Sequence, residues 1–375
     1  MNILHIITDL ANGGAEATLY KLLSNRPPAG TRHHVVSLRG LGKYGPMLLE
    51  NGVDVHTIKI GQENNIFIGL YSLYKIVKNI NPDLVQTWLY HADLIGGLVS
   101  RVAGVKKVYW GVRHSNLSVG KLKFRTILIA KLGALLSWFL PYKIISCSSD
   151  AVISHIKFGY NKNKFIVINN GYDFSVFYPE FSNVNKVKDE FCIPLDIPLI
   201  GMVARFDMQK DHYNLLMSLS YILNKNIKFL CVLVGDGMTV ENNKLMRWIN
   251  ELSLSDHVRL LGVYNDIPSI MNMLDIHVLS SLGEAFPNVV AEAMACATPC
   301  IATDVGDSKY IIGNTGWIVP AEDPVLLSDS LFNALNEMNN SYSWEDRKVK
   351  SRNRIIENYS IDKMCIDFYK TWEIL

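Results

Sequence analysis

In the stretch Ser280-Ser-Leu-Gly-Glu284-Ala-Phe-Pro287-Asn-Val-Val-Ala-Glu292-Ala-Met-Ala, the chain passes from the end of an apolar strand pattern into a helical pattern. Pro287 is predicted as the first helical residue, because its missing N–H and fixed φ cost nothing there. Helix N-termini attract anions through their unpaired N–H groups and the positive end of the helix dipole. We therefore interpret Glu284 and Glu292 as hydroxyl-binding groups beside a phosphate. The alternative is a solvated Glu284 before the helix and a capping Glu292 within it.

The same alternation of strand and helix extends through the whole chain. Apolar strand-like runs occur in the first half at 3–8, 34–38, 53–58, 84–88, 107–111, 143–147 and 165–168. They recur in the second half at 198–203, 229–234, 258–261, 276–279, 299–302 and 317–319. This rhythm predicts an α/β protein with two doubly wound parallel sheets. Two such domains facing a cleft would bind ligands at the carboxyl ends of their strands.

The rhythm pauses once, which places the domain boundary. It stops near 169–179 and restarts at 198, and the polar, irregular stretch 180–188 is predicted as the junction. We expect an N-terminal domain over 1–178, a C-terminal domain over 179–355, and a last helix over 356–375 that packs back on the N-terminal domain.

Composition indicates a well-buried globular protein. The 375 residues are 49% hydrophobic and 19% charged, and this composition argues against a disordered chain. The six cysteines form no C-x-x-C pair and lie mostly in apolar runs, so they are interpreted as reduced core thiols of a cytosolic protein. The first nine residues lack a basic region and run straight into a strand pattern, so no signal peptide is expected.

Charge is divided unevenly between the halves. Residues 1–180 contain 20 Lys and Arg against 10 Asp and Glu, a net of +10; residues 181–375 contain 17 against 25, a net of −8. No acidic residue occurs between Asp93 and Asp150, whereas nine basic residues do. We infer an anionic partner for the first half.

Polar residues follow several of the predicted strands. Gly13-Gly14 follows the first strand and opens a helix, where glycines let the backbone approach a phosphate or sugar, although a plain tight turn is the alternative. Arg205 and Lys210 follow the first strand of the second half and could converge on one diphosphate, unless they simply face solvent. His114 follows a mid-domain strand, where a structural histidine is the competing interpretation.

Together these features resemble a retaining GT-B glycosyltransferase of glycosyltransferase family 4, which includes many bacterial enzymes that build lipopolysaccharide, O-antigen and capsule sugars. The resemblance covers almost the whole chain. It rests on the early glycine pair, the histidine after a mid-domain strand, Asn170-Gly171-Tyr-Asp173, the pair of cations, Gly235-Asp-Gly237, and the two glutamates followed by Ala-Met-Ala-Cys-Ala-Thr-Pro299.

The resemblance implies roles for individual residues. Glu292 would bind the nucleotide ribose, Glu284 the donor sugar, and Arg205 with Lys210 the diphosphate. His114 would lie beside the transferred sugar, so His114, Arg205, Lys210 and Glu284 are the expected catalytic residues. The expected donor site also includes Gly14, Gly235, Phe286, Asn288 and Val289. The expected acceptor site comprises Gly13, Gly14, Arg113 and His114.

This chain departs from the family pattern at two positions. Many relatives have glycine after the phenylalanine of the loop, where this chain has Pro287-Asn288, so one backbone N–H is lost as a phosphate donor. Ala297 replaces the glycine that is usual before the proline. Both changes bear on the fine geometry of donor binding.

The charges suggest how the reaction would proceed. Breaking the bond between sugar and phosphate leaves an oxocarbenium-like sugar and extra negative charge on the diphosphate, which preorganised cations stabilise. Because no D-x-D triplet occurs, we expect neither a metal nor another cofactor, and Arg205 and Lys210 would supply the positive charge. As in the family, retention is expected through front-face attack, with a phosphate oxygen accepting the proton of the acceptor hydroxyl.

A segment of the first half has the composition of a membrane-surface helix. Residues 121–140 combine Lys121, Lys123 and Arg125 with apolar and aromatic residues and contain no acid. Lys131 divides the apolar run, and the part after it is too short to span a bilayer. A position in the membrane interface is therefore favoured. The alternative is that 127–139 is mainly a core helix.

The sequence therefore predicts a metal-independent glycosyltransferase at the cytoplasmic face of the membrane, peripherally bound to anionic lipid. Its donor would be a UDP- or GDP-sugar, its acceptor a lipid-linked or polysaccharide glycan, and nucleic acid no partner. Two alternatives are a nucleotide-sugar epimerase of the same two-domain build and a non-catalytic sugar-binding module.

Overall fold

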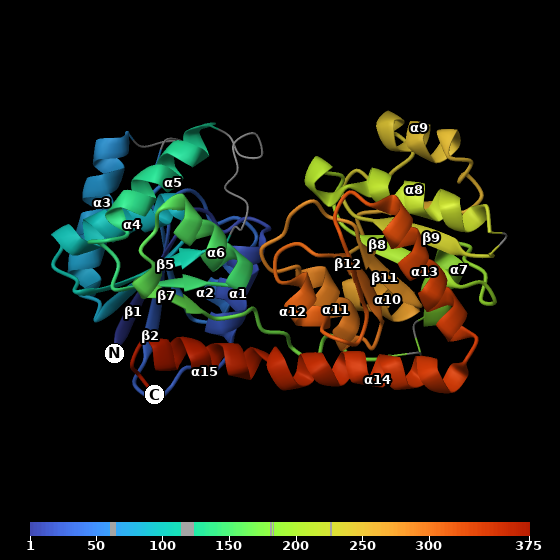
Figure 1. Ribbon diagram of the computed structural model, residues 1–375. Helices are drawn as coiled ribbons and strands as arrows, with labels where there is room; N and C mark the ends of the chain where they lie inside the picture. Colours follow the sequence, from blue (N-terminus) through green and yellow to red (C-terminus); the bar gives the residue numbers. More distant parts are fainter. Residues whose placement is uncertain (61–64, 114–123, 181, 183, 226) are drawn as a thin grey trace. The chain divides into compact units, whose positions relative to one another are not determined.

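The computed structural model describes all residues except 61–64, 114–123, 181, 183 and 226. The chain forms two compact units (Figure 1). The first consists of Met1–Gly171 and Ile361–Leu375, and the second of Tyr172–Ser360. Each is built on one parallel sheet with helices on both faces, which confirms the predicted α/β class.

The first unit contains a seven-stranded sheet in the order β3-β2-β1-β4-β5-β6-β7. Its strands are β1 Asn2–Ile7, β2 Arg32–Ser37, β3 Asp54–Thr57, β4 Leu84–Trp88, β5 Lys107–Val112, β6 Lys143–Ser146 and β7 Phe165–Val167. Side chains alternate across the sheet, so Ile3 and Ile7 enter one core cluster and Leu4 and Ile6 the other. Both faces are therefore covered.

Different helices cover the two faces of this sheet. The cluster of Ile3 and Ile7 includes side chains from α1 Gly14–Ser24, α2 Tyr44–Glu50 and α15 Ile361–Thr371. The cluster of Leu4 and Ile6 includes side chains from α3 Ile66–Ile80, α4 Tyr90–Val102 and α5 Phe124–Leu136. The unit is completed by α6 Ser149–Phe158 and the short η1 Lys162–Lys164.

The second unit contains a six-stranded sheet in the order β10-β9-β8-β11-β12-β13. Its strands are β8 Leu199–Val203, β9 Leu230–Val234, β10 Val258–Gly262, β11 Ile276–Leu279, β12 Cys300–Thr303 and β13 Trp317–Val319. Its helices are α7 Val184–Glu190, η2 Met208–Lys210, α8 His212–Leu223, α9 Asn243–Glu251, α10 Ile267–Met273, α11 Asn288–Ala295, α12 Ser308–Ile312, α13 Pro324–Met338 and α14 Ser341–Asn358. The central strands are buried along their whole length, as expected for a parallel sheet covered on both faces.

The structure divides the chain at residues other than those predicted. The first unit ends at Gly171, before the expected boundary at 178, and the chain returns to it at Ile361 instead of 356. The stretch 180–188, predicted as the junction, lies within the second unit and leads into α7, which packs against α10. Its polar composition reflects a half-exposed helix.

The C-terminal helix α15 is joined to the first sheet by a buried hydrogen-bond relay. The indole N–H of Trp88 lies 3.3 Å from Nδ1 of His5, and Nε2 of His5 lies 2.9 Å from Nδ1 of His33. Nε2 of His33 lies 3.3 Å from the hydroxyl of Tyr369 on α15. Because indole can only donate, His5 Nε2 and His33 Nε2 must carry the protons. Nδ1 of His5 and Nδ1 of His33 therefore each accept one hydrogen bond.

Burial makes this relay sensitive to acid. It lowers the pKa of His5 well below its usual value and that of His33 to about 4, against about 6.5 in an unfolded chain. The contribution of His33 to stability is therefore complete above about pH 6.5 and falls as the pH drops toward 4, by up to roughly 1.4 kcal/mol per pH unit.

We predict that His33→Gln flattens the dependence of unfolding free energy on pH over this window, because the variant lacks the titrating imidazole. Urea denaturation at several pH values measures the effect, with His56→Gln on β3, an exposed histidine, as the control. An unchanged slope in His33→Gln would show that the relay does not couple protons to folding.

Candidate functional site

The second unit has a topological switch point between β8 and β11. These strands are parallel neighbours, and the strands that follow them in sequence, β9 and β12, lie on opposite sides. Ligands of such sheets bind beside the carboxyl ends of the strands at this point. The β8–α8 loop carries Arg205 and Lys210, and the β11–α11 loop carries Glu284. Sheet topology therefore brings the predicted donor-site residues to one place.

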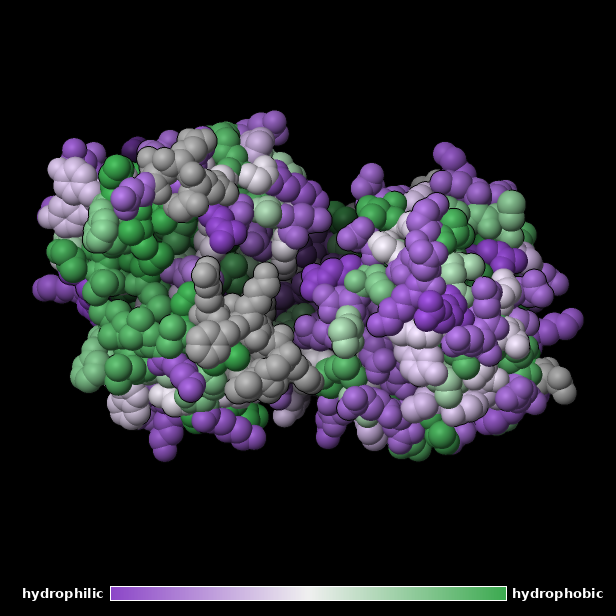
Figure 2. Space-filling view, turned by 90° about the horizontal axis from the view of Figure 1, so that it is seen from above, coloured by the Kyte–Doolittle hydropathy of each residue, from purple (hydrophilic) through white to green (hydrophobic). Residues whose placement is uncertain are grey.

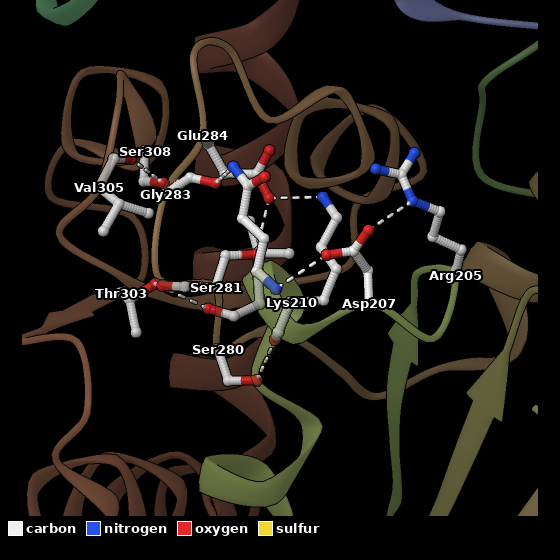
Figure 3. Close-up of polar contacts among 12 residues, drawn as sticks. Arg205, Asp207, Lys210, Ser280, Ser281, Gly283, Glu284, Thr303, Val305 and Ser308 are labelled. Atoms are coloured by element: carbon white, nitrogen blue, oxygen red, sulfur yellow. Dashed lines mark hydrogen bonds and ion pairs between the residues drawn. The ribbon is translucent and has the colours of Figure 1, made fainter. Parts of the chain in front are cut away.

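An ion pair joins the two loops (Figure 3). Nζ of Lys210 lies 2.5 Å from Oε1 of Glu284, and the hydroxyl of Ser281 donates to the same oxygen at 2.6 Å. The Lys210 and Glu284 side chains are only 21% and 12% exposed. Partial burial strengthens the attraction relative to a surface pair and keeps both charged groups in a defined position.

Hydrogen bonds to backbone carbonyls also hold the two loops together. The N–H of Leu282 donates to the carbonyl of Gln209 at 2.7 Å, and the side-chain amide of Gln209 donates to the carbonyl of Gly283. The hydroxyl of Ser280 donates to the carbonyl of Asp211 at 2.9 Å. The position of Glu284 therefore depends on the neighbouring loop as well as on its own.

Arg205 lies in a more open position than Lys210. Its Nε is 3.2 Å from Oδ2 of Asp207, and its side chain is 65% exposed. Figure 3 shows Asp207 between the two cations. The pKa of Asp207 is lowered by the backbone N–H of Gln209 and then by Arg205 and Lys210. Exposed pairs contribute at most about 1 kcal/mol, so the guanidinium can exchange Asp207 for an anionic ligand at little cost.

Gly235 allows the turn after β9 to approach this loop. Its φ of +141° is disfavoured for other residues, and a Cβ atom there would lie 2.3 Å from the carbonyl oxygen of Ala204. The N–H of Phe206 donates to the carbonyl of Asp236 at 2.7 Å. Glycine is therefore required for close packing beside Arg205.

The start of α11 is fixed by aromatic packing. The hydroxyl of Tyr172 donates to Oδ1 of Asn288 at 2.7 Å, and the Tyr172 ring stacks on Phe286. Val289 and Glu292 follow along α11, both half-buried. Glu292 thus lies in the second turn of the helix, whose N-terminus carries the partial positive charge described above.

The first unit has its own polar cluster at the carboxyl edge of its sheet. Arg113, directly after β5, donates from Nη1 to Oδ1 of Asn170 at 2.7 Å and lies over the Trp88 ring at 4.8 Å. Burial lowers the pKa of Arg113, while Cys147 and Asp93 oppose this effect. The hydroxyl of Thr18 on α1 lies 3.2 Å from the same Asn170 oxygen.

The glycine pair lies at the start of α1 in this cluster. Gly13 is the N-cap residue and Gly14 the first residue of α1. A Cβ atom at Gly13 would lie 2.3 Å from a carboxylate oxygen of Glu16, so the glutamate covers this backbone. The carbonyl of Gly14 accepts the Thr18 hydroxyl at 2.8 Å. Asn170 therefore links the glycine turn to Arg113, and His114 lies outside the described residues.

Comparison with known proteins identifies this arrangement. Residues 12–176 match the family described as Glycosyltransferase Family 4, and residues 197–337 match the family described as Glycosyl transferases group 1. A UDP-Gal:alpha-D-GlcNAc-diphosphoundecaprenol alpha-1,3-galactosyltransferase of Escherichia coli is 26% identical over 298 residues, 78% of this chain and 76% of its own. The capsular polysaccharide biosynthesis glycosyltransferase CapM of Staphylococcus aureus is 24% identical over 291 residues, 75% and 76% of the two chains.

A solved structure agrees over the full length. Anabaena Alr3699/HepE in complex with UDP and glucose has a TM-score of 0.86 at 18% identity, covering 100% of both chains. The chain is a GT4-type glycosyltransferase with the GT-B fold. It acts in polysaccharide or glycan biosynthesis.

The two departures from the family pattern have structural consequences in this glycosyltransferase. Pro287, predicted as the first helical residue, is the N-cap of α11, and the helix begins one residue later, at Asn288. Ala297, the residue after the C-cap of α11, has a left-handed φ of 63°. A non-glycine residue in that conformation costs about 1–3 kcal/mol, which explains why glycine is usual there.

The structure also shows positioning residues that sequence reasoning gave no role. Gln209 and Ser281 hold the Glu284 loop, Tyr172 fixes Asn288, and Asn170 orients Arg113. Asn170 and Tyr172 belong to the motif Asn170-Gly171-Tyr-Asp173, and Ser281 lies just after a strand, but no local pattern assigns them a role. Their contacts connect segments far apart in the chain, which no local pattern reveals.

We predict that Lys210 and Glu284 are coupled in the stability of the glycosyltransferase. Lys210→Met should destabilise it by leaving a mostly buried carboxylate without this cation, and Glu284→Gln should cost less in the Lys210→Met background than alone. A coupling of roughly 0.5–3 kcal/mol is expected from a urea-denaturation double-mutant cycle. Strict additivity would show that the two groups do not interact in solution.

Proposed function

We propose that this glycosyltransferase transfers a sugar, with retention, from a UDP- or GDP-sugar to a lipid-linked or polysaccharide acceptor. The observation that carries the proposal is the Lys210–Glu284 pair at the switch point, with the exposed Arg205 beside it. A cation and a carboxylate held in one site match a donor that offers a diphosphate next to sugar hydroxyls.

The donor would be held by both loops and by α11. Arg205 and Lys210 would bind the diphosphate, and Glu284 would exchange part of its contact with Lys210 for hydroxyls of the donor sugar. Glu292, in α11, would bind the ribose. The Escherichia coli relative is named for UDP-galactose and the Anabaena structure contains UDP and glucose, which favours UDP over GDP here.

In the proposed reaction, the bond between the anomeric carbon and the phosphate oxygen breaks, and its electron pair stays on the leaving nucleoside diphosphate. The acceptor oxygen forms the new bond from the same face of the sugar, and its proton passes to a phosphate oxygen. Arg205 and Lys210 would stabilise the developing negative charge, a contribution of about 3 kcal/mol for one well-placed donor. Charge balance therefore requires no external co-reactant.

We also propose that the reaction needs no metal ion, because side-chain cations lie where charge would develop. Among the residues that the structure describes, no group of three or more His, Cys, Asp and Glu side chains is arranged to hold one. Magnesium and manganese in phosphate sites are held mainly by oxygen ligands, which Lys210 and Arg205 do not offer.

The acceptor would bind the first unit, at Gly13, Gly14, Arg113 and the neighbouring His114. A partly buried arginine suits an anionic group, and the Escherichia coli relative is named for a diphosphoundecaprenol acceptor. A lipid diphosphate is therefore the acceptor that we favour over a free polysaccharide.

Such an acceptor would place the enzyme at the cytoplasmic face of the membrane, on anionic lipid. No helix in the described ranges is long and apolar enough to cross a bilayer.

We predict that Arg205→Ala and Lys210→Ala each lower turnover by roughly two to three orders of magnitude, as expected for groups matched to transition-state charge. The measurement is slow hydrolysis of UDP- and GDP-sugars, which needs no acceptor, with and without EDTA. Lys225→Ala, which removes a surface ion pair with Asp329 in the same unit, is the matched control.

Four results of this assay would contradict parts of the proposal. Normal turnover in Arg205→Ala or Lys210→Ala would remove that residue from catalysis, and loss of activity in EDTA restored by manganese would show a metal-dependent donor site. Release of an isomerised nucleotide sugar would identify an epimerase, and binding without turnover a sugar-binding module.

A further inference from the structure

Three neighbouring helices of the first unit expose apolar side chains on their outer surface. α4 packs between α3 and α5. Phe67 on α3, Val102 on α4 and Phe139 just after α5 are 76%, 70% and 76% exposed. Figure 2 shows hydrophobic side chains gathered over this side of the unit. We call this the three-helix surface, and its exposed apolar residues are Ile66, Phe67, Ile68, Tyr71, Leu98, Val102, Leu128, Leu132, Leu135, Trp138 and Phe139.

The surface exists because α4 lies deep against the sheet. A Cβ atom at Gly96 would lie 2.9 Å from Ile6, and one at Gly97 would lie 2.6 Å from the indole nitrogen of Trp110. These glycines let α4 approach the strands closely, so Leu98 and Val102 are left on its outer side. Large exposed apolar patches on a protein surface mark interaction sites.

Helix α5 is apolar on both sides, and the core-helix interpretation of 127–139 holds for one of them. Ile127, Ala130 and Ala134 are buried against the unit, as a core helix requires. Leu128 and Leu135 are 60% and 64% exposed on the opposite side. Packing within the unit therefore accounts for only one side of the helix.

Charge distinguishes between the occupants that could cover this surface. The three helices contain one acidic residue, Asp93, and it is buried. Exposed lysines lie among the apolar residues, at Lys75, Lys78 and Lys131, and Nζ of Lys75 lies over the Tyr71 ring at 4.7 Å. Two copies of this chain packed through the same surface would bring these cations together. An anionic lipid surface is complementary to both the charges and the apolar side chains.

We propose that the three-helix surface docks on an anionic bilayer, with its aromatic and aliphatic side chains in the acyl boundary and its lysines at the headgroups. This inference rests on the proposed function, since a lipid-linked acceptor brings the enzyme to a bilayer. It extends the docking region from 121–140 to α3 and α4. It also makes apolar contact, as well as charge, a source of affinity.

The test is cosedimentation with vesicles of phosphatidylcholine alone or mixed with phosphatidylglycerol. Phe67→Ser with Ile68→Ser, and separately Leu135→Ser with Phe139→Ser, should each weaken binding to the mixed vesicles by about tenfold or more, because each loses buried apolar area. Val240→Ser with Val263→Ser, which removes exposed apolar residues of the second unit, is the matched control. Lys75, Lys78 and Lys131 replaced together by Gln test the charge component.

Salt separates the two components of binding. Raising salt from about 0.1 M to about 1 M shortens the screening length from about 10 Å to about 3 Å, so the wild type should lose part of its affinity and the lysine variant little. The serine variants should remain monomeric, keep the wild-type melting temperature and hydrolyse donor at the wild-type rate, because the substituted residues are exposed and outside the donor site.

Unchanged vesicle binding by both serine pairs would overturn the inference. So would a wild-type dimer that the same substitutions dissociate, without vesicle binding, since the occupant would then be a second copy. A wild type that binds vesicles through this surface but hydrolyses no nucleotide sugar would instead contradict the proposed function.

Discussion

The pairing of β8 with β11 is the constraint on which the donor site depends. Because these two strands are parallel neighbours at a topological switch point, the loops at their carboxyl ends meet although they are far apart in sequence. The Lys210–Glu284 ion pair is held in place by two hydrogen bonds, from Gln209 to the carbonyl of Gly283 and from Ser281 to Glu284. A cation held beside a carboxylate in this way would be preorganised for the proposed diphosphate sugar.

The first unit depends in a comparable way on a segment from the far end of the chain. Helix α15 covers one face of its sheet and is tied to β1 and β2 through Tyr369, His33 and His5. The opposite face is covered by α3, α4 and α5, whose outer sides stay apolar. One sheet therefore supports both the polar cluster around Arg113 and the proposed lipid-facing surface.

Much of the fold could be predicted because apolar runs report parallel strands directly. The run at 84–88 coincides with β4, and the two-sheet class follows from the alternation of such runs with helices. The unit boundary at Gly171 could not be predicted from the sequence, because it depends on which residues contact one another in the folded chain. The exposure of Phe67 and Leu98 was equally hidden, since an apolar residue has the same sequence signature in a core and on a surface. Glu284 and Lys210 could be proposed from the sequence because each lies in a loop that follows a strand, whereas the contacts of Gln209 depend on the fold.

The most direct measurement of the central claim is hydrogen exchange of the backbone amides with and without UDP or GDP. We expect the nucleotide to protect the segments 205–211 and 280–295, which would make the proposed diphosphate, sugar and ribose contacts, and Lys210→Ala to reduce this protection. Protection confined to the separate small pocket of the second unit, lined by Ser175, Tyr178, Glu180 and Asn272, with none at the switch-point loops, would contradict it.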